Sequence, residues 1–329
     1  MLFDLLKKAR ALNASDVHLA VGLAPRVRVQ GALREQAAPP VTQQLLEQEL
    51  RGLLPESAWQ TLARTGEADA AFSDNDGERY RLNAYLQGGQ YALAVRLLAS
   101  SIPSCAELGL PPSVQQLAEL EQGLVLSVGP TGSGKSTTLA SILQRINMSR
   151  AVHIVTLEDP VEYVYPQGQA LISQREIGRD TAGFASGLRS ALRQDPDVIL
   201  VGELRDSESI AMALSAAETG HLVFATLHTQ DAAGSINRIL DALPERQAQV
   251  RTQLAECLQA IVCQRLLPRA DGRGRVAAFE VLVATEALRN LIREGRTHQL
   301  ESYIQTGKRF GMMTLAESVS ELRRQGIIK

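Results

Sequence analysis

Apolar and polar residues are patterned differently in the two parts of the chain. Residues 17–98 mix short strand-like runs with two stretches of helical periodicity, which predicts an α+β domain. A helix that ends near Asn13 is expected before them. The expected strands cover 17–20, 26–29, 70–72 and 79–85, with a hairpin turn at Asn75-Asp76-Gly77, and the expected helices cover 42–54 and 56–65.

From residue 119 onward, short apolar runs alternate with helical segments. Such runs are typical of parallel strands that are buried on both faces, and the alternation predicts βαβ units with a mostly parallel sheet. The expected strands cover 124–128, 153–157, 198–201 and 222–226. The expected helices cover 135–146, 183–194, 207–219 and 247–262, with further helices from about 279 to 329.

Prolines interrupt regular structure between these two parts, at Pro103, Pro111 and Pro112. We therefore predict an N-terminal domain over 1–98, a linker over 99–118 and a second domain over 119–329. A chain of 329 residues is long enough for two such domains.

Charge and cysteine content narrow the possible functions only slightly. The formal net charge of −2 gives no overall electrostatic reason to expect nucleic acid or membrane binding. Residues 287–329 hold eight Lys and Arg against four Asp and Glu, which fits either a basic face or a solvated helix surface. Cys105, Cys257 and Cys263 form no C-x-x-C pair, so we expect buried free thiols in a reducing compartment.

The N-terminus does not have the order of a signal peptide. Apolar residues of the segment 2–6 precede the basic residues Lys7, Lys8 and Arg10, whereas a signal peptide begins with its charges. No apolar stretch approaches the 18 or so residues that a membrane span needs. We therefore expect the chain to stay in the cytoplasm.

One segment fits the phosphate-binding pattern G-x-x-x-x-G-K-[ST] in full, and it lies between a predicted strand and a predicted helix. Backbone N–H groups of such a loop and the helix N-terminus bind phosphates. Lys135 supplies a positive charge for the β- and γ-phosphates, and the Ser136 hydroxyl suits Mg²⁺. The candidate nucleotide-binding residues are Gly129, Pro130, Thr131, Gly132, Ser133, Gly134, Lys135, Ser136 and Thr137.

Acidic residues follow two other predicted strands. The apolar run 198–201 is followed by Gly202-Glu203, the arrangement of a Walker B strand, and Glu203 is placed to polarise the attacking water. Glu158, Asp159 and Glu162 follow the strand 153–157, at the edge where open parallel sheets bind ligands. Solvated loop acids are an equally good interpretation of these three.

Two of the five histidines bracket one predicted strand. His221 precedes the strand 222–226 and His228 follows it. A buried, hydrogen-bonded histidine at a strand end is one interpretation. An imidazole near a γ-phosphate is the other.

Together and in this order, four segments resemble the Walker A, Asp box, Walker B and His box of the secretion-superfamily ATPases. They are GPTGSGKS, TLEDPVE, DPDVILVGELRD and ETGHLVFATLHT. The resemblance extends over nearly the whole chain: ASDVHL, RYRLNAY, ALRNLIRE, IQTG and GMMTL are similar to segments of PilT-type ATPases that retract type IV pili.

This resemblance implies an α/β protein with a PAS-like N-terminal domain, a RecA-like P-loop core and C-terminal helices, assembled as a homo-hexamer. It implies ATP and Mg²⁺ as ligands, with Mg²⁺ at Ser136. It also implies Glu203 as the catalytic glutamate, Glu162 as the functional acid of the Asp box, and His221 and His228 as the His-box pair.

The chain departs from the extension and secretion branches at 267–275, where those ATPases usually carry a four-cysteine zinc motif. No cysteine is present there, so we expect no zinc. The alternatives to retraction are an extension or secretion ATPase of the same superfamily, or a weakly hydrolysing accessory retraction subunit. A DNA motor would need a basic stripe with stacking aromatics, and the sequence has none, so no nucleic acid partner is expected.

Further expectations concern subunits and partners. Arg79, Arg81 and Arg96 are candidates to complete a neighbouring subunit's site, because an arginine finger supplied in trans couples such sites. Leu288 and Arg289, on a helix over 287–294, are candidates to couple the ring to an inner-membrane pilus platform protein. That contact would hold the motor at the membrane periphery, and a second retraction ATPase is a further possible partner.

Overall fold

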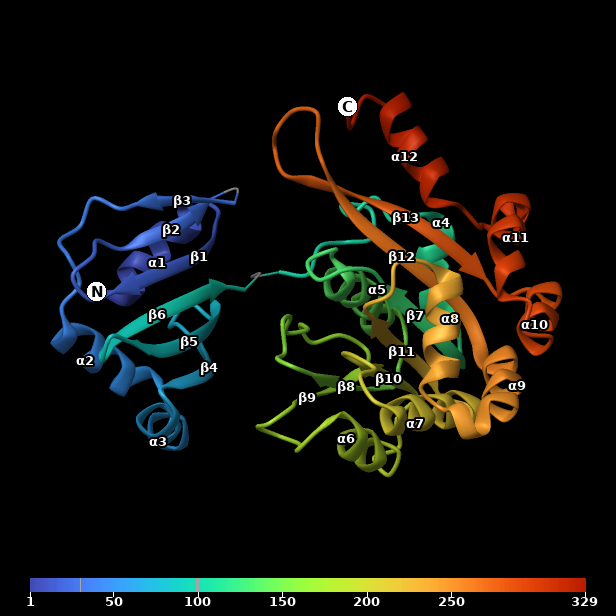
Figure 1. The fold of residues 1–329 in the computed structure, drawn as a ribbon, viewed down its shortest axis with the longest axis horizontal. Helices are drawn as coiled ribbons and strands as arrows, with labels where there is room; N and C mark the ends of the chain where they lie inside the picture. The colour runs from blue at the N-terminus through green and yellow to red at the C-terminus, as the bar shows by residue number, and fades with distance from the viewer. Residues whose placement is uncertain (30, 99–100) are drawn as a thin grey trace. The chain divides into compact units, whose positions relative to one another are not determined.

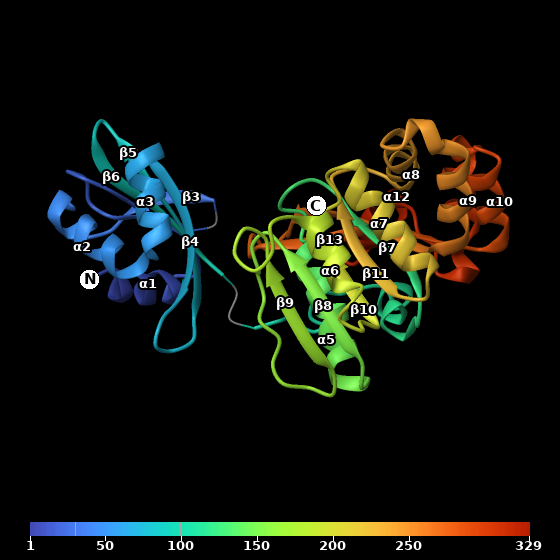
Figure 2. The same cartoon turned by 90° about the horizontal axis from the view of Figure 1, so that it is seen from below.

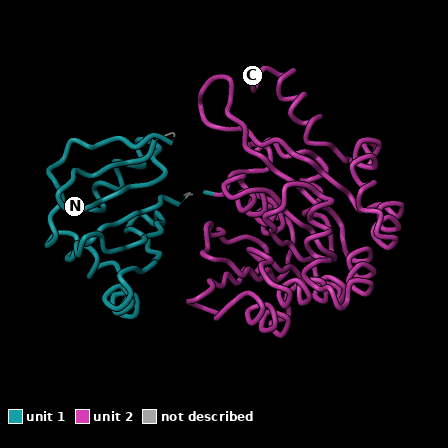
Figure 3. The backbone as a smooth tube through the Cα atoms, in the orientation of Figure 1, with its two compact units in different colours: residues 1–101 teal, residues 102–329 magenta. Residues whose placement is uncertain are grey.

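The computed structural model describes residues 1–29, 31–98 and 101–329. The chain forms two compact units, residues 1–101 and 102–329 (Figure 3). Residues 99–100 of the predicted linker lie outside the described residues, and its residues 102–118 belong to the second unit.

The first unit is built on a six-stranded sheet in the order β3-β2-β1-β6-β5-β4 (Figure 1). Every neighbouring pair of strands is antiparallel. The chain order is α1 (Leu2–Ala11), β1 (Ala14–Ala20), β2 (Arg26–Val29), β3 (Ala32–Glu35), α2 (Gln43–Leu53), α3 (Glu56–Thr65), β4 (Glu67–Ser73), β5 (Arg79–Gln87) and β6 (Gln90–Leu97).

Alternation along β5 shows how this sheet gains a core on one face. Tyr80 and Leu82 are fully buried and belong to the same apolar cluster as Leu6 of α1, Leu46 of α2 and Leu62 of α3. The residues between them on β5 are only partly buried. Because successive strand side chains point to opposite faces, the three helices cover the apolar face and leave the other face polar.

The second unit contains a seven-stranded sheet in the order β13-β12-β7-β11-β10-β8-β9 (Figure 2). Its pairs are parallel except β12 with β13. The strands are β7 (Gly123–Val128), β8 (His153–Glu158), β9 (Leu171–Glu176), β10 (Val198–Val201), β11 (Leu222–Leu227), β12 (Leu258–Pro268) and β13 (Arg275–Val283).

Helices cover both faces of this sheet. Leu124 and Leu126 of β7 pack in one apolar cluster with residues of α6 to α11, whereas Val125 packs in a second cluster with residues of α5. The helices are α4 (Pro112–Gln115), α5 (Lys135–Ser149), α6 (Phe184–Ala191), α7 (Ser207–Glu218), α8 (Ala232–Asp241), α9 (Gln247–Cys257), α10 (Glu286–Arg293), α11 (Leu300–Thr306) and α12 (Leu315–Arg324), with 3₁₀ turns at Gln116–Glu119, Pro244–Arg246, Thr297–Gln299 and Lys308–Phe310.

The predicted mixed α/β class with a mostly parallel core sheet is confirmed, but the segment after 257 differs from the sequence prediction. The expected helix over 247–262 ends at Cys257, and β12 begins at Leu258. The expected helical region from 279 begins inside β13. Side chains of 258–263 are almost all buried on β12 between β7 and β13, and this tertiary pairing overrides a local pattern that also fits a helix. Sequence reasoning also missed β3, β6, β9, α4 and α8.

No helix among the described residues is both long and apolar enough to cross a membrane.

Candidate nucleotide-binding site

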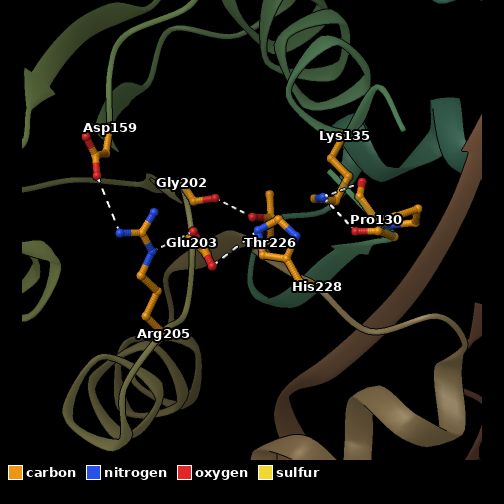
Figure 4. Close-up of polar contacts among 9 residues, drawn as sticks. Pro130, Lys135, Asp159, Gly202, Glu203, Arg205, Thr226 and His228 are labelled. Atoms are coloured by element: carbon orange, nitrogen blue, oxygen red, sulfur yellow. Dashed lines mark hydrogen bonds and ion pairs between the residues drawn. The ribbon is translucent and has the colours of Figure 1, made fainter. Parts of the chain in front are cut away.

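The predicted P-loop connects the end of β7 to the first turn of α5. Lys135 is 8% exposed, and its Nζ donates hydrogen bonds to the carbonyl oxygens of Gly129 (2.7 Å) and Pro130 (3.1 Å) (Figure 4). Burial lowers the pKa of Lys135, while the charges of Glu203 and Glu162 act in the opposite direction. The lysine is therefore held inside its own loop, where the charges of Glu203 and Glu162 oppose the effect of burial.

Strand β12 packs closely against this loop through Gln264. Gly134 has a φ of 91°, and a Cβ there would stand 2.7 Å from the Gln264 Nε2. The Gln264 Oε1 accepts a 2.7 Å hydrogen bond from the Thr138 hydroxyl on α5. Only glycine fits at position 134, because both the backbone angle and the lack of space exclude a side chain.

Glu203 lies just beyond the end of β10, and both its carboxylate oxygens have partners (Figure 4). His228 Nε2 is 3.2 Å from Oε1, and Arg205 Nε is 2.7 Å from Oε2. Arg205 also lies 3.6 Å from Asp159, which follows β8. A Cβ at Gly202 would stand 3.0 Å from the Leu157 carbonyl oxygen, a tight contact that favours glycine before Glu203. The parallel order β11-β10-β8 thus brings His228, Glu203 and Asp159 together.

The Asp-box segment contributes two acids with different environments. The Glu158 carboxylate accepts hydrogen bonds from Thr156 (2.7 Å) and Gln174 (3.1 Å). Burial raises the pKa of Glu158, and these two hydrogen bonds only partly oppose that effect. Glu162 lines the cavity described below, and the hydroxyls of Tyr163 and Thr137 are 2.9 Å apart, which joins this segment to the start of α5.

The P-loop, the Asp box, Glu203 and His228 line one cavity of 530 Å³, which is within the size range of small-ligand sites. Its donors suit a nucleotide with Mg²⁺. The Ser133 Oγ is buried without a hydrogen-bond partner among the described residues, so a phosphate oxygen would satisfy it. The Ser136 hydroxyl, Glu162 and Glu203 present hard oxygen ligands of the kind that Mg²⁺ prefers.

The structure does not bring the two predicted histidines together. His228 lines the cavity at the carboxyl end of β11, whereas His221 precedes the strand and lines a separate polar cavity with Arg150 and Asp197. The six residues of β11, about 20 Å of extended backbone, lie between the two histidines. Within one chain His228 lines the P-loop cavity and His221 does not, which favours the strand-end interpretation for His221, whose Nδ1 lies 3.0 Å from the Ala216 carbonyl oxygen. The assignment of the two residues as a His-box pair stays a prediction.

The three candidate trans arginines lie on the sheet of the first unit. Arg81 and Arg96 are register partners on β5 and β6, where Arg96 pairs with Asp16 (3.0 Å) and Arg81 lies 3.8 Å from Asp69. Arg79 has a buried Nη1 with no hydrogen-bond partner among the described residues.

Leu288 and Arg289, the two candidate coupling residues, both contact the core of the second unit, and their role in coupling the ring to a partner stays a prediction. Leu288 is fully buried in the core of the second unit. The Arg289 Nη1 donates 2.6 Å hydrogen bonds to the carbonyl oxygens of Ala255 and Glu256. These two residues lie in the last turn of α9, just before its final residue, Cys257. Both side chains therefore attach α10 to the core, because a cation at a helix C-terminus satisfies its free carbonyls.

Sequence reasoning missed two residues that line the cavity, Arg205 and Arg275, and one that packs against the P-loop, Gln264. Arg205 lies in the Walker B segment only two residues after Glu203, and this short spacing could have predicted that the two side chains interact. Gln264 and Arg275 come from β12 and β13, whose proximity to the P-loop depends on strand order and had no local signal.

The fold and the cavity define a P-loop nucleotide-binding protein, and comparisons with known proteins identify the family. Residues 86–327 match the family model described as type II/IV secretion system protein, and the chain belongs to this family. It is 43% identical to the type IV pilus retraction ATPase PilT of Pseudomonas aeruginosa, over 99% of this chain and 94% of that protein. It is 49% identical to the uncharacterized protein YggR of Escherichia coli K12, over 93% of each chain.

Among solved structures, the chain is similar to the pilus retraction motor PilT with bound ADP. The TM-score is 0.92 at 44% identity, over 99% of this chain and 94% of that one. The predicted resemblance to PilT-type ATPases and the predicted fold class are confirmed.

We predict that Glu158→Gln stabilises the nucleotide-free protein at pH 7 to 8. Glutamine keeps the oxygen that accepts from Thr156 and Gln174 but avoids burying a charge. The pKa of Glu158 is raised in the folded state, so the free energy of unfolding of the wild type falls as pH rises through that pKa. The loss is about 1.4 kcal/mol for each unit by which the folded-state pKa exceeds the unfolded-state pKa. Urea unfolding at several pH values should show an advantage for the variant that shrinks toward pH 4.5.

The exposed Glu245 supplies a matched control. Glu245→Gln should change the free energy of unfolding by a small amount at every pH. A Glu158→Gln variant that is no more stable than wild type at pH 8 would show that the folded protein stabilises the Glu158 carboxylate.

We predict that Leu288→Ala lowers the free energy of unfolding by about 2–5 kcal/mol, since it empties a fully buried position. Arg289→Ala should cost about 1–3 kcal/mol by leaving the Ala255 and Glu256 carbonyls without their donor. Denaturant unfolding measures both. The control is Ala287→Ser, on the exposed face of the same helix, which should unfold like wild type. Wild-type stability of the Leu288→Ala variant would contradict its place in the core.

Proposed function

We propose that this chain is an ATP-hydrolysing motor that drives the retraction of type IV pili. The observation that carries the ATPase part is the meeting of a complete P-loop, Glu203 and His228 in one cavity. Support for retraction comes from the relationship to PilT over nearly the full chain. No cysteine stands at 267–275, where extension ATPases usually carry their zinc ligands, and this favours the retraction branch over the extension branch.

The residues in the cavity divide the chemistry between them. An oxygen of Glu203 accepts the proton of the attacking water, while Arg205 and His228 hold the carboxylate in place. When ATP binds, the Lys135 Nζ donates to oxygens of the β- and γ-phosphates in place of the carbonyl oxygens of its own loop. Ser136, with Glu162 nearby, would hold Mg²⁺, which neutralises charge on the phosphates.

Assembly extends this proposal beyond one chain. Six copies form the ring, and Arg79, Arg81 or Arg96 of one copy completes the site of the next. The ring works at the cytoplasmic side of the inner membrane through a pilus platform protein, with a second retraction ATPase as a further partner. The PilT-type relationship and the need to couple neighbouring sites support these statements.

Lys135→Ala and Glu203→Gln should fail in different ways. Without Lys135 the phosphates lose their cation, so ATP affinity and turnover should both fall. Glu203→Gln retains the shape but removes the base, so ATP should bind normally while kcat falls by about 10²–10⁴-fold. Steady-state ATPase assays and equilibrium ATP binding measure both.

Glu208→Gln is the matched control, because this acid lies on α7 outside the cavity and should retain wild-type kcat. Wild-type turnover in Glu203→Gln would remove Glu203 as the base. Normal ATPase activity together with undiminished pilus retraction in cells that lack the protein would remove the motor function and leave an ATPase with another task.

Mixed rings test the arginine proposal. Lys135→Ala subunits lack a working P-loop, and subunits with an arginine changed to Ala lack the trans residue. Mixing the two inactive proteins creates some sites with an intact P-loop and an intact neighbouring arginine, so a fraction of the ATPase activity should return. If none of Arg79→Ala, Arg81→Ala and Arg96→Ala shows this recovery, no arginine of the three acts in trans.

A further inference from the structure

The Asp-box segment is attached to β9 on both sides of Glu162. The Val161 backbone N–H donates a 3.2 Å hydrogen bond to the Glu176 Oε2. After Glu162, the Tyr163 carbonyl oxygen accepts a 2.8 Å hydrogen bond from the Gln174 Nε2. Val161 and Tyr163 are 7% and 9% exposed, whereas Glu162 between them is exposed and lines the nucleotide cavity. The backbone on both sides of Glu162 is therefore fixed to the sheet.

A pair of hydroxyls joins the same segment to the P-loop end of α5. The Tyr163 hydroxyl and the Thr137 Oγ1 are 2.9 Å apart, and both residues line the nucleotide cavity. Thr137 lies in the first turn of α5, directly after Ser136. Among the described residues, the other hydrogen bond between the segment 159–166 and α5 runs from the Asn147 Nδ2 to the Pro166 carbonyl oxygen (2.9 Å), in the last turn of that helix. At the P-loop end, the hydroxyl pair is thus the hydrogen bond that holds the segment to the helix.

This pair connects the two oxygen ligands that the proposed function gives to Mg²⁺. Glu162 precedes Tyr163 and Ser136 precedes Thr137, so each ligand is the chain neighbour of one hydroxyl. Mg²⁺ needs near-ideal octahedral geometry at about 2.0–2.1 Å, whereas Ca²⁺ accepts a flexible arrangement at about 2.3–2.6 Å. A small error in the separation of Glu162 and Ser136 therefore weakens Mg²⁺ binding more than Ca²⁺ binding.

We propose that Tyr163 is a positioning residue for the metal: its hydroxyl, through Thr137, sets the separation of Glu162 and Ser136 and so the affinity of the site for Mg²⁺ bound with ATP. This inference rests on the proposed function, which assigns Mg²⁺ to Ser136 with Glu162 nearby. The Tyr163 hydroxyl acts through the two ligands and not on the phosphates. It therefore contributes to nucleotide binding when Mg²⁺ is present and not when the metal is removed.

Calorimetric titrations with the non-hydrolysable ATP analogue AMP-PNP, in Mg²⁺, in Ca²⁺ and in EDTA, test this role. Tyr163→Phe keeps the buried ring and removes the hydroxyl. It should raise the dissociation constant in Mg²⁺ by about three- to tenfold, the range of one hydrogen bond. The increase should be smaller in Ca²⁺, which tolerates misplaced ligands. In EDTA the dissociation constant should stay within about twofold of wild type, because the P-loop still binds the phosphates.

Two further variants complete the test. Thr137→Val removes the other hydroxyl and should give the same pattern in the three solutions. Because the two hydroxyls form one contact, the double variant should bind AMP-PNP in Mg²⁺ no more weakly than the weaker single variant. Tyr303→Phe is the matched control, since Tyr303 lies on α11 outside the cavity and the loss of its hydroxyl should leave all three dissociation constants as in wild type.

Three results would overturn the proposal. Equal weakening by Tyr163→Phe in Mg²⁺ and in EDTA would mean that the hydroxyl supports the P-loop and not the metal ligands. An unchanged dissociation constant in Mg²⁺ would show that the hydroxyl does not set their separation. Losses that add in the double variant would show that Tyr163 and Thr137 act independently. A wild-type protein that binds AMP-PNP equally well in Mg²⁺ and in EDTA would instead refute the metal assignment of the proposed function.

Discussion

The contact between β12 and the P-loop is the constraint on which the nucleotide site depends. Gln264 fills the space beside Gly134 and accepts a hydrogen bond from Thr138, so a single buried amide joins the sheet, the loop and the first turn of α5. A P-loop binds phosphates with backbone N–H groups, and their directions are only as well defined as the packing that holds the loop. Placing β12 beside β7 supplies that packing and also carries the β12–β13 hairpin to the edge of the cavity.

Strand order then distributes chemistry to the two sides of the loop. On the β11-β10-β8 side, Glu203 is held between His228 and Arg205, and Arg205 reaches toward Asp159. On the β12–β13 side the lining is Leu266 and the unengaged Arg275. An acid held between an imidazole and a guanidinium suits the positioning of the attacking water. The mostly parallel sheet produces this division because the carboxyl ends of its parallel strands lie at the same edge.

Sequence reasoning succeeded where function is local and failed where it depends on pairing. The P-loop and Glu203 are recognised because glycines, a lysine and a strand-end acid stand within a few residues of one another, next to an apolar strand. The hairpin of β12 and β13 has no such signal, since 247–262 has an apolar pattern that a helix also fits. His221 precedes β11 and His228 follows it, so the parallel strands place the two residues at opposite ends of the sheet, and the order of the residues in the sequence already contained this signal.

Leu288 and Arg289 show the same limit for a motif. Helical periodicity alone placed Leu288 on the apolar face of its helix, and the structure buries it. Arg289 looked free to meet a partner because no local pattern reveals that the end of α9 lies within its reach. An arginine that satisfies two helix-terminal carbonyls is not exchangeable for a surface residue, since its loss leaves both carbonyls without a donor. Through Arg289, α10 is attached to the end of α9, and α9 leads directly into β12, the strand that pairs with β7 next to the P-loop. An effect of α10 on the motor therefore has a direct structural route to the nucleotide site.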